Sequence, residues 1–291
     1  MLAKLALDVK AELGEGSVWD YRTGQLYWVD ILKCELHRFT PATGTDELFP
    51  VGQFIGTVVP RLSGGVVIAL KDGIHHLDTL TGAIRPLADT EKDVTGNRFN
   101  DGKCDPQGRF WVGSTSLNCD VPGAGSLYCM DTDQSVRRML TGLTISNGLV
   151  WTEDAKTMYF IDTAAQAVWG FDFNSRTGEI TRKRTVIAIP ENEGFPDGMS
   201  IDSRGMLWIA LFGGGKVCCY DPGNGEKLAE VQVAASRITS CAFGGELLDQ
   251  LYITTARMGL DEAALAREPL AGGLFIAKPG VTGIKASLFR G

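Results

Sequence analysis

The sequence predicts an all-β protein, a six-bladed β-propeller with four antiparallel strands in each blade. Three observations support this prediction. Short runs rich in aromatic and β-branched residues alternate with polar, glycine-containing turns along the whole chain. A shared pattern recurs about every 40 to 50 residues, a period typical of propeller blades. Amphipathic helical patterns are nearly absent, so the chain lacks the crossover helices that a parallel sheet needs.

Each repeat contains a turn, an aromatic strand, a short turn and a second strand that ends near an Asp or Thr. In chain order, the runs that we expect to form strands include 22–30, 41–49, 63–78, 106–114, 123–131, 156–162, 167–173, 204–211, 216–221 and 249–256. The landmarks of successive repeats are Asp20, Leu62, Asp105, Thr152, Asp202 and Phe243. Six landmarks with a period long enough for four strands predict six blades.

The two ends of the chain offer alternative ways to close the ring. In many propellers the first and last units share a blade, and either 5–9 or 284–289 could supply the closing strand. The sequence DEAALAR at 261–267 is the exception to the β pattern and predicts one short helix. No Pro/Ser-rich linker divides the chain, so we expect residues 1–291 to form a single domain.

Composition excludes several classes of partner. The net charge is −7 and no Lys/Arg-rich run occurs, so we expect neither nucleic acid nor an anionic membrane as a partner. No apolar stretch approaches the roughly 20 residues of a membrane span, and the charged N-terminus lacks a signal-peptide core. Seven cysteines without a CxxC pair are typical of reduced thiols. We therefore expect a cytoplasmic protein that is a monomer or a weak homo-oligomer.

Four polar residues lie five positions before the landmarks of four repeats: Glu15, Asn100, Asn147 and Asp197. In equivalent blades these side chains would occupy equivalent places, so two carboxylates and two amides would converge near the axis. Such oxygen donors are the ligands that hard divalent cations prefer. Glycine follows three of the four directly, which permits close packing at a crowded axis. Asx-Gly pairs are also common turn signals, and that simpler interpretation remains open.

Longer motifs surround these residues: LGEGSVWD, NRFNDGKCDPQGRFWVGS, ISNGLVWTEDAKTMYFIDT and PDGMSIDSRGMLWIAL. With them the chain, from about residue 10 to residue 276, resembles the senescence marker protein/gluconolactonase/regucalcin family, and most of all its bacterial sugar-acid lactonases. The resemblance implies a six-bladed propeller with one divalent metal near the axis. It further implies that Glu15, Asn147 and Asp197 bind the metal and that Arg98 and Asn100 contact the substrate.

The segment before the strand GSLY departs from the family pattern. Some members carry a substrate-contacting Glu there, whereas 115–125 of this chain contains only one acid, Asp120. The substrate preference of those members therefore does not carry over. The oxygen donors favour Ca²⁺, although Mg²⁺, Mn²⁺, Fe²⁺ and Zn²⁺ are alternatives. Only three histidines occur, none beside the four polar residues, so we do not expect a zinc cage of His and Cys.

These observations predict an enzyme that hydrolyses a sugar lactone, such as a glucono-, xylono-, arabino- or galactonolactone, to the aldonic acid. The metal would polarise the lactone carbonyl, and Asp197 would activate the attacking water. One alternative is a metal-dependent esterase or organophosphate hydrolase on the same scaffold. Another is a non-catalytic calcium-binding protein, against which Arg98 and Asn100 stand as polar groups that an ion site does not need.

Overall fold

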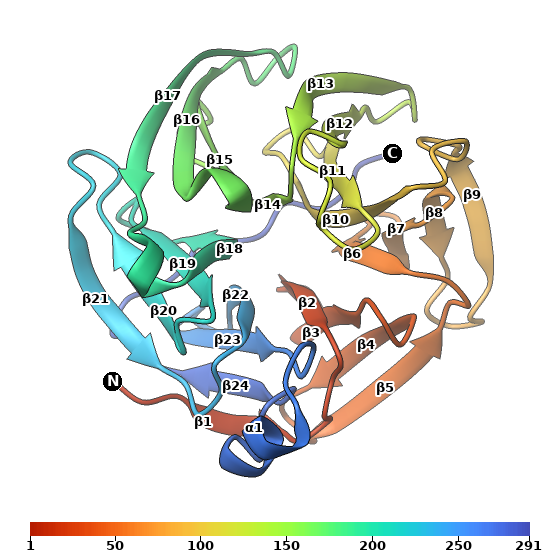
Figure 1. Cartoon of the computed structure of the whole chain (residues 1–291). Helices are drawn as coiled ribbons and strands as arrows, with labels where there is room; N and C mark the ends of the chain where they lie inside the picture. Colours follow the sequence, from red (N-terminus) through yellow and green to blue (C-terminus); the bar gives the residue numbers. More distant parts are fainter.

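The computed structural model describes residues 1–291 as six four-stranded antiparallel sheets set around a central axis (Figure 1). The predicted six-bladed propeller is confirmed. The first three sheets contain β2 (Gly14–Asp20), β3 (Gln25–Asp30), β4 (Glu35–Thr40) and β5 (Thr45–Pro50); β6 (Ile55–Pro60), β7 (Val66–Leu70), β8 (Gly73–Leu77) and β9 (Ile84–Ala88); and β10 (Asn97–Cys104), β11 (Phe110–Ser116), β12 (Gly125–Met130) and β13 (Val136–Leu143).

The other three sheets repeat this arrangement. They contain β14 (Ser146–Trp151), β15 (Thr157–Asp162), β16 (Ala167–Phe173) and β17 (Ile180–Ala188); β18 (Phe195–Ile201), β19 (Leu207–Phe212), β20 (Lys216–Tyr220) and β21 (Lys227–Gln232); and β22 (Ile238–Gly244), β23 (Gln250–Thr255), β24 (Leu274–Ala277) and β1 (Lys4–Leu7). The strands β2, β6, β10, β14, β18 and β22 line the axis. We call the face where these inner strands begin the upper face, and the face where they end the lower face.

The ring is closed by the N-terminal segment. Strand β1 pairs with β24, with Lys4 opposite Ile276 and Leu5 opposite Phe275. The alternative closing strand, 284–289, is wrong: this segment adds to no blade and instead crosses the lower face. There the Gly283 N–H donates to the Leu248 carbonyl at 2.8 Å. In Figure 1 the C-terminal segment passes behind β18 and β14.

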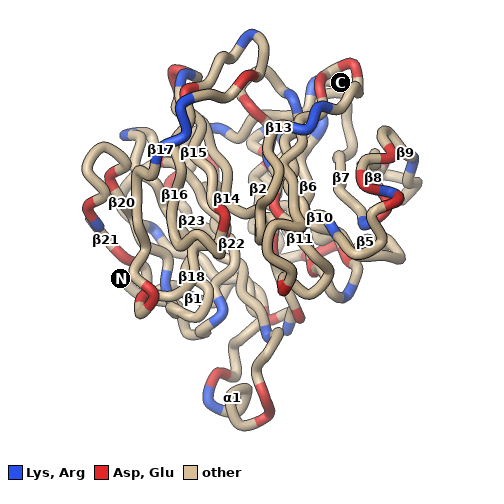
Figure 2. Tube along the Cα trace, turned by 45° about the horizontal axis from the view of Figure 1, so that its top comes forward, with Lys and Arg blue, Asp and Glu red and all other residues tan.

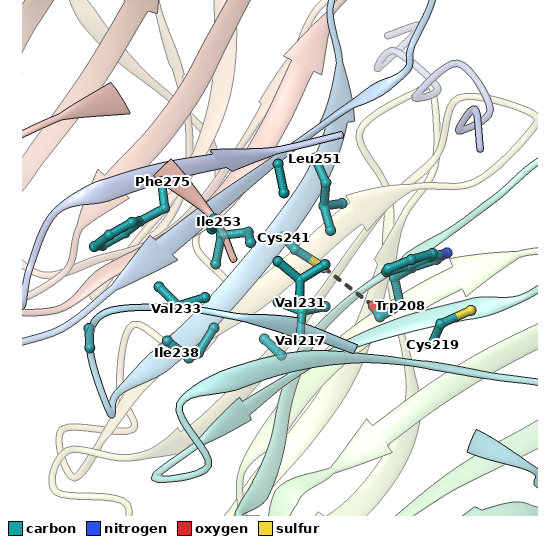
Figure 3. Packing of buried hydrophobic residues seen from close by; sticks show 14 of the residues in the cluster. Trp208, Val217, Cys219, Val231, Val233, Ile238, Cys241, Leu251, Ile253 and Phe275 are labelled. Atoms are coloured by element: carbon teal, nitrogen blue, oxygen red, sulfur yellow. Dashed lines mark hydrogen bonds between the residues drawn. The ribbon is translucent and has the colours of Figure 1, made fainter. Parts of the chain in front are cut away.

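The hydrophobic core lies between neighbouring sheets. Figure 3 shows the cluster between the sheet of β18 and that of β22, where Trp208 from β19 packs with residues of the next blade. The Cys241 thiol donates to the Trp208 carbonyl at 3.3 Å and joins the two sheets (Figure 3). Cys219 belongs to this cluster, whereas Cys218 packs on the opposite face of β20. All seven cysteines are free, as expected.

Two of the acidic landmarks, Asp105 and Asp202, bond directly to the aromatic strand that follows them. Asp105 accepts a hydrogen bond from the Trp111 indole N–H at 2.9 Å, and Asp202 accepts one from Trp208 at 3.2 Å. Each carboxylate also accepts backbone N–H groups of the turn that follows it. In these two blades one Asp therefore holds both the turn and the tryptophan of the returning strand.

The predicted helix is present as α1 (Glu262–Arg267), with Asp261 as its N-cap, accepting from the Ala264 N–H at 2.8 Å. The loop that carries α1 connects β23 to β24 and stands out from the blades (Figure 2). Two single turns, η1 (Thr163–Ala165) and η2 (Glu191–Glu193), also lie on the upper face. None of these helices has the length and hydropathy needed to cross a membrane.

Candidate functional site

The inner strands share a β-bulge near the upper face. In β10, β14 and β18 the pairing register shifts across Phe99/Gly102, Ser146/Leu149 and Pro196/Met199, so Asn100, Asn147 and Asp197 lie inside the bulges. In β2 the shift follows Glu15 directly. A bulge leaves residues out of the ladder and changes the direction of their side chains. The shared offset of the four polar residues in the sequence therefore corresponds to a shared backbone irregularity next to the axis.

A chain of hydrogen bonds links three of these strands. Arg98 Nη1 donates to Asn100 Oδ1 at 2.7 Å, and Asn100 Nδ2 donates to Asn147 Oδ1 at 2.9 Å. Asn147 Nδ2 then donates to Thr163 Oγ1 at 2.7 Å, and Thr163 Oγ1 donates to the Pro196 carbonyl at 2.7 Å. Since a guanidinium can only donate, Asn100 must turn its oxygen toward Arg98 and its nitrogen toward Asn147, and the chain fixes which end of each amide is oxygen. It also couples β18, next to Asp197, to the two amides.

Glu15 and Asp197 form a buried acidic pair. Burial raises the pKa of Glu15 to about 8, helped by the nearby charge of Asp101. Burial, followed by the charge of Glu15, raises the pKa of Asp197 well above its usual range. The two carboxyl groups lie close enough for each to shift the pKa of the other. Like charges that are buried together cannot both ionise unless a cation compensates them.

The donors fit a hard divalent cation. Asp197 Oδ1 is buried without a hydrogen-bond partner, and such an orphaned carboxylate oxygen costs free energy unless a proton or a cation satisfies it. Glu15 supplies a second carboxylate, and the carbonyl oxygen of Asn147 can accept more than the one bond it receives. No group of three His, Cys, Asp or Glu side chains is assembled for a metal. A cation here would therefore need the Asn147 amide, with water completing its shell.

Arg98 lies between the amide chain and the loop that joins β11 to β12. Its guanidinium is buried and donates to the Phe99 carbonyl at 3.0 Å and to Cys119 Sγ at 3.2 Å. Cys119, which the sequence did not single out, belongs to this loop. The single acid of the loop, Asp120, faces Ser116, whose hydroxyl lies 3.1 Å from Asp120 Oδ1. Asp120 thus holds the loop in shape.

Asp101 is a further site residue that sequence reasoning missed. Its carboxyl group is buried, Oδ1 accepts the Gly102 N–H at 2.7 Å, and Oδ2 has no partner. Its charge raises the pKa of both Glu15 and Asp197. One feature of the sequence could have revealed Asp101. It stands between Asn100 and Gly102, whereas the other three polar residues precede a glycine directly. Thr163 was also missed, and nothing in the repeat pattern marked it.

Two glycines next to the polar residues are needed for close packing. A Cβ on Gly148 would lie 2.8 Å from the Asp197 carbonyl oxygen, and a Cβ on Gly198 would lie 2.8 Å from the Ser240 Cα. Real Cβ atoms do not approach backbone so closely. The crowded axis expected from the sequence is therefore present, and it places β14, β18 and β22 in backbone contact beside the acidic pair.

Comparison with known proteins agrees with this fold. Residues 13–257 match the model of the SMP-30/gluconolactonase/LRE-like region. The chain is 40% identical to zebrafish (Danio rerio) regucalcin over 285 residues, which cover 97% of this chain and 96% of the relative. It is 37% identical to YvrE of Bacillus subtilis, provisionally named a sugar lactone lactonase, over 100% of this chain and 99% of that protein.

Among solved structures, a calcium-binding protein from Agrobacterium tumefaciens, regucalcin, superposes with a TM-score of 0.95 at 30% identity, covering 99% of this chain and 97% of that one. The family match includes Glu15, Arg98, Asn100, Asn147 and Asp197 within its bounds. Sequence similarity over nearly the full length and the shared six-bladed architecture lead to one conclusion. The chain belongs to the SMP-30/gluconolactonase family.

Proposed function

We propose that this protein hydrolyses a sugar lactone to its aldonic acid with the help of one divalent metal ion. The proposal rests on the buried pair of Glu15 and Asp197. Two buried carboxylates need a cation to compensate their charges, and this pair lies beside the hydrogen-bonded amides of Asn100 and Asn147. Family membership, and the lactonase name of the B. subtilis relative, support the reaction class. The free thiols further support a reducing compartment such as the cytoplasm.

The proposed metal ligands are Glu15, Asn147 and Asp197, with water in the remaining positions. All three donors are oxygen atoms, which favours Ca²⁺, and the A. tumefaciens relative is a calcium-binding protein. Mg²⁺, Mn²⁺, Fe²⁺ and Zn²⁺ remain alternatives because availability decides occupancy at such sites as much as donor type. When bound, the ion would supply Lewis-acid polarisation of the lactone carbonyl.

The residues of the chain then carry the proton and position the sugar. Asp197 takes a proton from the attacking water, whose oxygen forms a bond to the carbonyl carbon. The bond between that carbon and the ring oxygen breaks, and the ring oxygen receives the proton, so lactone and water become a hydroxy acid. Arg98 donates charge-assisted hydrogen bonds to sugar oxygens, and Asn100 orients Arg98 through the 2.7 Å contact.

The decisive test is a matrix of metals against lactones, with acid release as the readout. Purified protein is freed of metal, loaded with each ion, and assayed on glucono-, xylono-, arabino- and galactonolactone. We expect one ion to restore activity and Asp197→Asn to lower kcat by roughly 10²–10⁴-fold while circular dichroism stays unchanged. Glu262→Gln, an exposed carboxylate on α1, is the matched control. Full activity of Asp197→Asn without metal would overturn the proposal.

A second function is favoured by the regucalcin relatives: calcium binding without catalysis. Calcium binding would use the same metal ligands, but it does not explain why the buried Arg98 lies beside the β11–β12 loop. The same matrix, extended to aryl and phosphate esters, separates the two. Tight calcium binding with no turnover of any lactone or ester supports the non-catalytic function. Turnover of the esters alone would instead identify the esterase or organophosphate hydrolase alternative.

A further inference from the structure

A cavity lies on the lower face, at the opposite end of the axis from Glu15 and Asp197. Its volume is ≈ 530 Å³, and its walls are the final residues of the inner strands together with the C-terminal segment 283–287. Lys103 and Ser200, which line it, come three residues after Asn100 and Asp197 on the same strands, roughly 10 Å further along at the usual rise of a strand. The volume is typical of small-molecule sites, which hold about 300–1,000 Å³.

The walls of this lower cavity are mainly apolar and aromatic. Trp19, Trp151 and Phe243 line it from three different blades, and Ile284 lines it from the C-terminal segment. The three aromatic side chains are buried, and Ile284 is half-buried. Aromatic walls favour a ligand with an apolar body that can pack against rings.

One half-buried cation, Lys103, lines the cavity. Its ammonium donates to the Met199 carbonyl, which uses one of its three donors. Lys103 forms no salt bridge, and Asp101, two residues earlier on β10, attracts it only at longer range. The other charged residues of the lining, Glu153 and Lys285, are exposed at the edge. Thus the interior of the cavity offers an ammonium that has donors to spare and no anion beside it.

We propose that the lower cavity binds a small monocarboxylic acid with a flat apolar body. The carboxylate accepts from Lys103 Nζ, and the body packs against Trp19, Trp151 and Phe243. A charge-assisted hydrogen bond in a half-buried setting favours an anion over a neutral analogue of the same shape. This site is separate from the lactonase site, and the proposal holds whether or not the upper face catalyses lactone hydrolysis.

The test compares 1-naphthoate with its uncharged methyl ester by isothermal titration calorimetry on the full-length, metal-loaded protein. We expect 1:1 binding of the acid and at least tenfold weaker binding of the ester, since a hydrogen bond to a charged group corresponds to roughly 10- to 100-fold in affinity. Lys103→Met should weaken the acid to the level of the ester. Lys278→Met, an exposed lysine outside the cavity, is the matched control and should leave affinity within about twofold.

Two further variants locate the ligand. Ile284→Trp fills the cavity from the C-terminal segment, leaves Lys103 unsubstituted and should abolish binding. Asp197→Asn alters only the upper site and should leave naphthoate affinity unchanged. Equal affinity for acid and ester, no binding at millimolar concentration, or loss in Asp197→Asn but not in Ile284→Trp would each overturn the proposal. The comparison of acid with ester needs no variant, so it decides the question even if Lys103→Met fails to fold.

Discussion

The acidic pair makes the stability of the metal-free protein depend on pH in an unusual direction. The pKa of Glu15 lies near 8 in the folded protein, well above its ordinary value near 4.5. A carboxyl group whose pKa is raised by folding binds its proton more tightly in the folded state. Its stabilising contribution is fully present below pH 4.5 and is lost as the pH rises toward 8. Asp197 is shifted in the same direction and adds to the effect.

The expected magnitude follows from the linkage of protons to folding. Between the unfolded and folded pKa values, one group changes the free energy of unfolding by up to about 1.4 kcal/mol per pH unit. From pH 5 to pH 7, Glu15 alone should therefore remove about 2.5 kcal/mol of stability. For a chain of this size, that loss lowers the melting temperature by on the order of 5 °C.

Urea unfolding, followed by tryptophan fluorescence at pH 5, 6 and 7, measures this effect after dialysis against chelator. Glu15→Gln removes the titrating group, so its loss of stability between pH 5 and 7 should be about 2.5 kcal/mol smaller than that of the wild type. Glu262→Gln should behave as the wild type. Excess Ca²⁺ should flatten the wild-type curve, because a cation replaces the proton between the carboxylates. Identical pH dependence in wild type and Glu15→Gln would refute the argument.

Two other predictions concern the same region. Arg98→Lys keeps the charge but loses the planar guanidinium that contacts Asn100, the Phe99 carbonyl and Cys119. The kcat/KM for the lactone should fall roughly tenfold or more, while the metal affinity measured by calorimetry stays within about twofold. An equal loss of metal affinity would contradict a role of Arg98 in substrate binding. Gly148→Ala places a Cβ 2.8 Å from the Asp197 carbonyl and should reduce the free energy of unfolding by about 1–3 kcal/mol, measured in urea; a neutral effect would show that β14 and β18 can separate.

Local chemistry explains why the architecture was predictable from the sequence. In two blades an Asp before the turn and a Trp after it lie six residues apart and bond directly, as Asp105 does with Trp111 and Asp202 with Trp208. Interactions over so few residues repeat in the sequence with the blade itself. The same holds for Asp261, which caps the short helix from the adjacent position. Strand number and blade number therefore follow from patterns that the chain shows in order.

Closure of the ring and the chemistry of the axis depended on contacts between distant segments. Both 5–9 and 284–289 have the composition of a strand, and only the pairing with β24 selects the N-terminal one. The role of Asp101 and the raised pKa values of Glu15 and Asp197 arise from burial by several blades at once, which no single repeat contains.

By itself, the sequence determined the number of blades and the position along each inner strand at which a polar side chain recurs, because both follow from short-range periodicity. Tertiary structure alone decided which of those side chains meet. It pairs Asn100 with Asn147 and Glu15 with Asp197, and it encloses a lysine in a cavity under the C-terminal segment. The physical reason is that desolvation and side-chain contact depend on the whole ring, whereas strand and turn formation depend on neighbours along the chain.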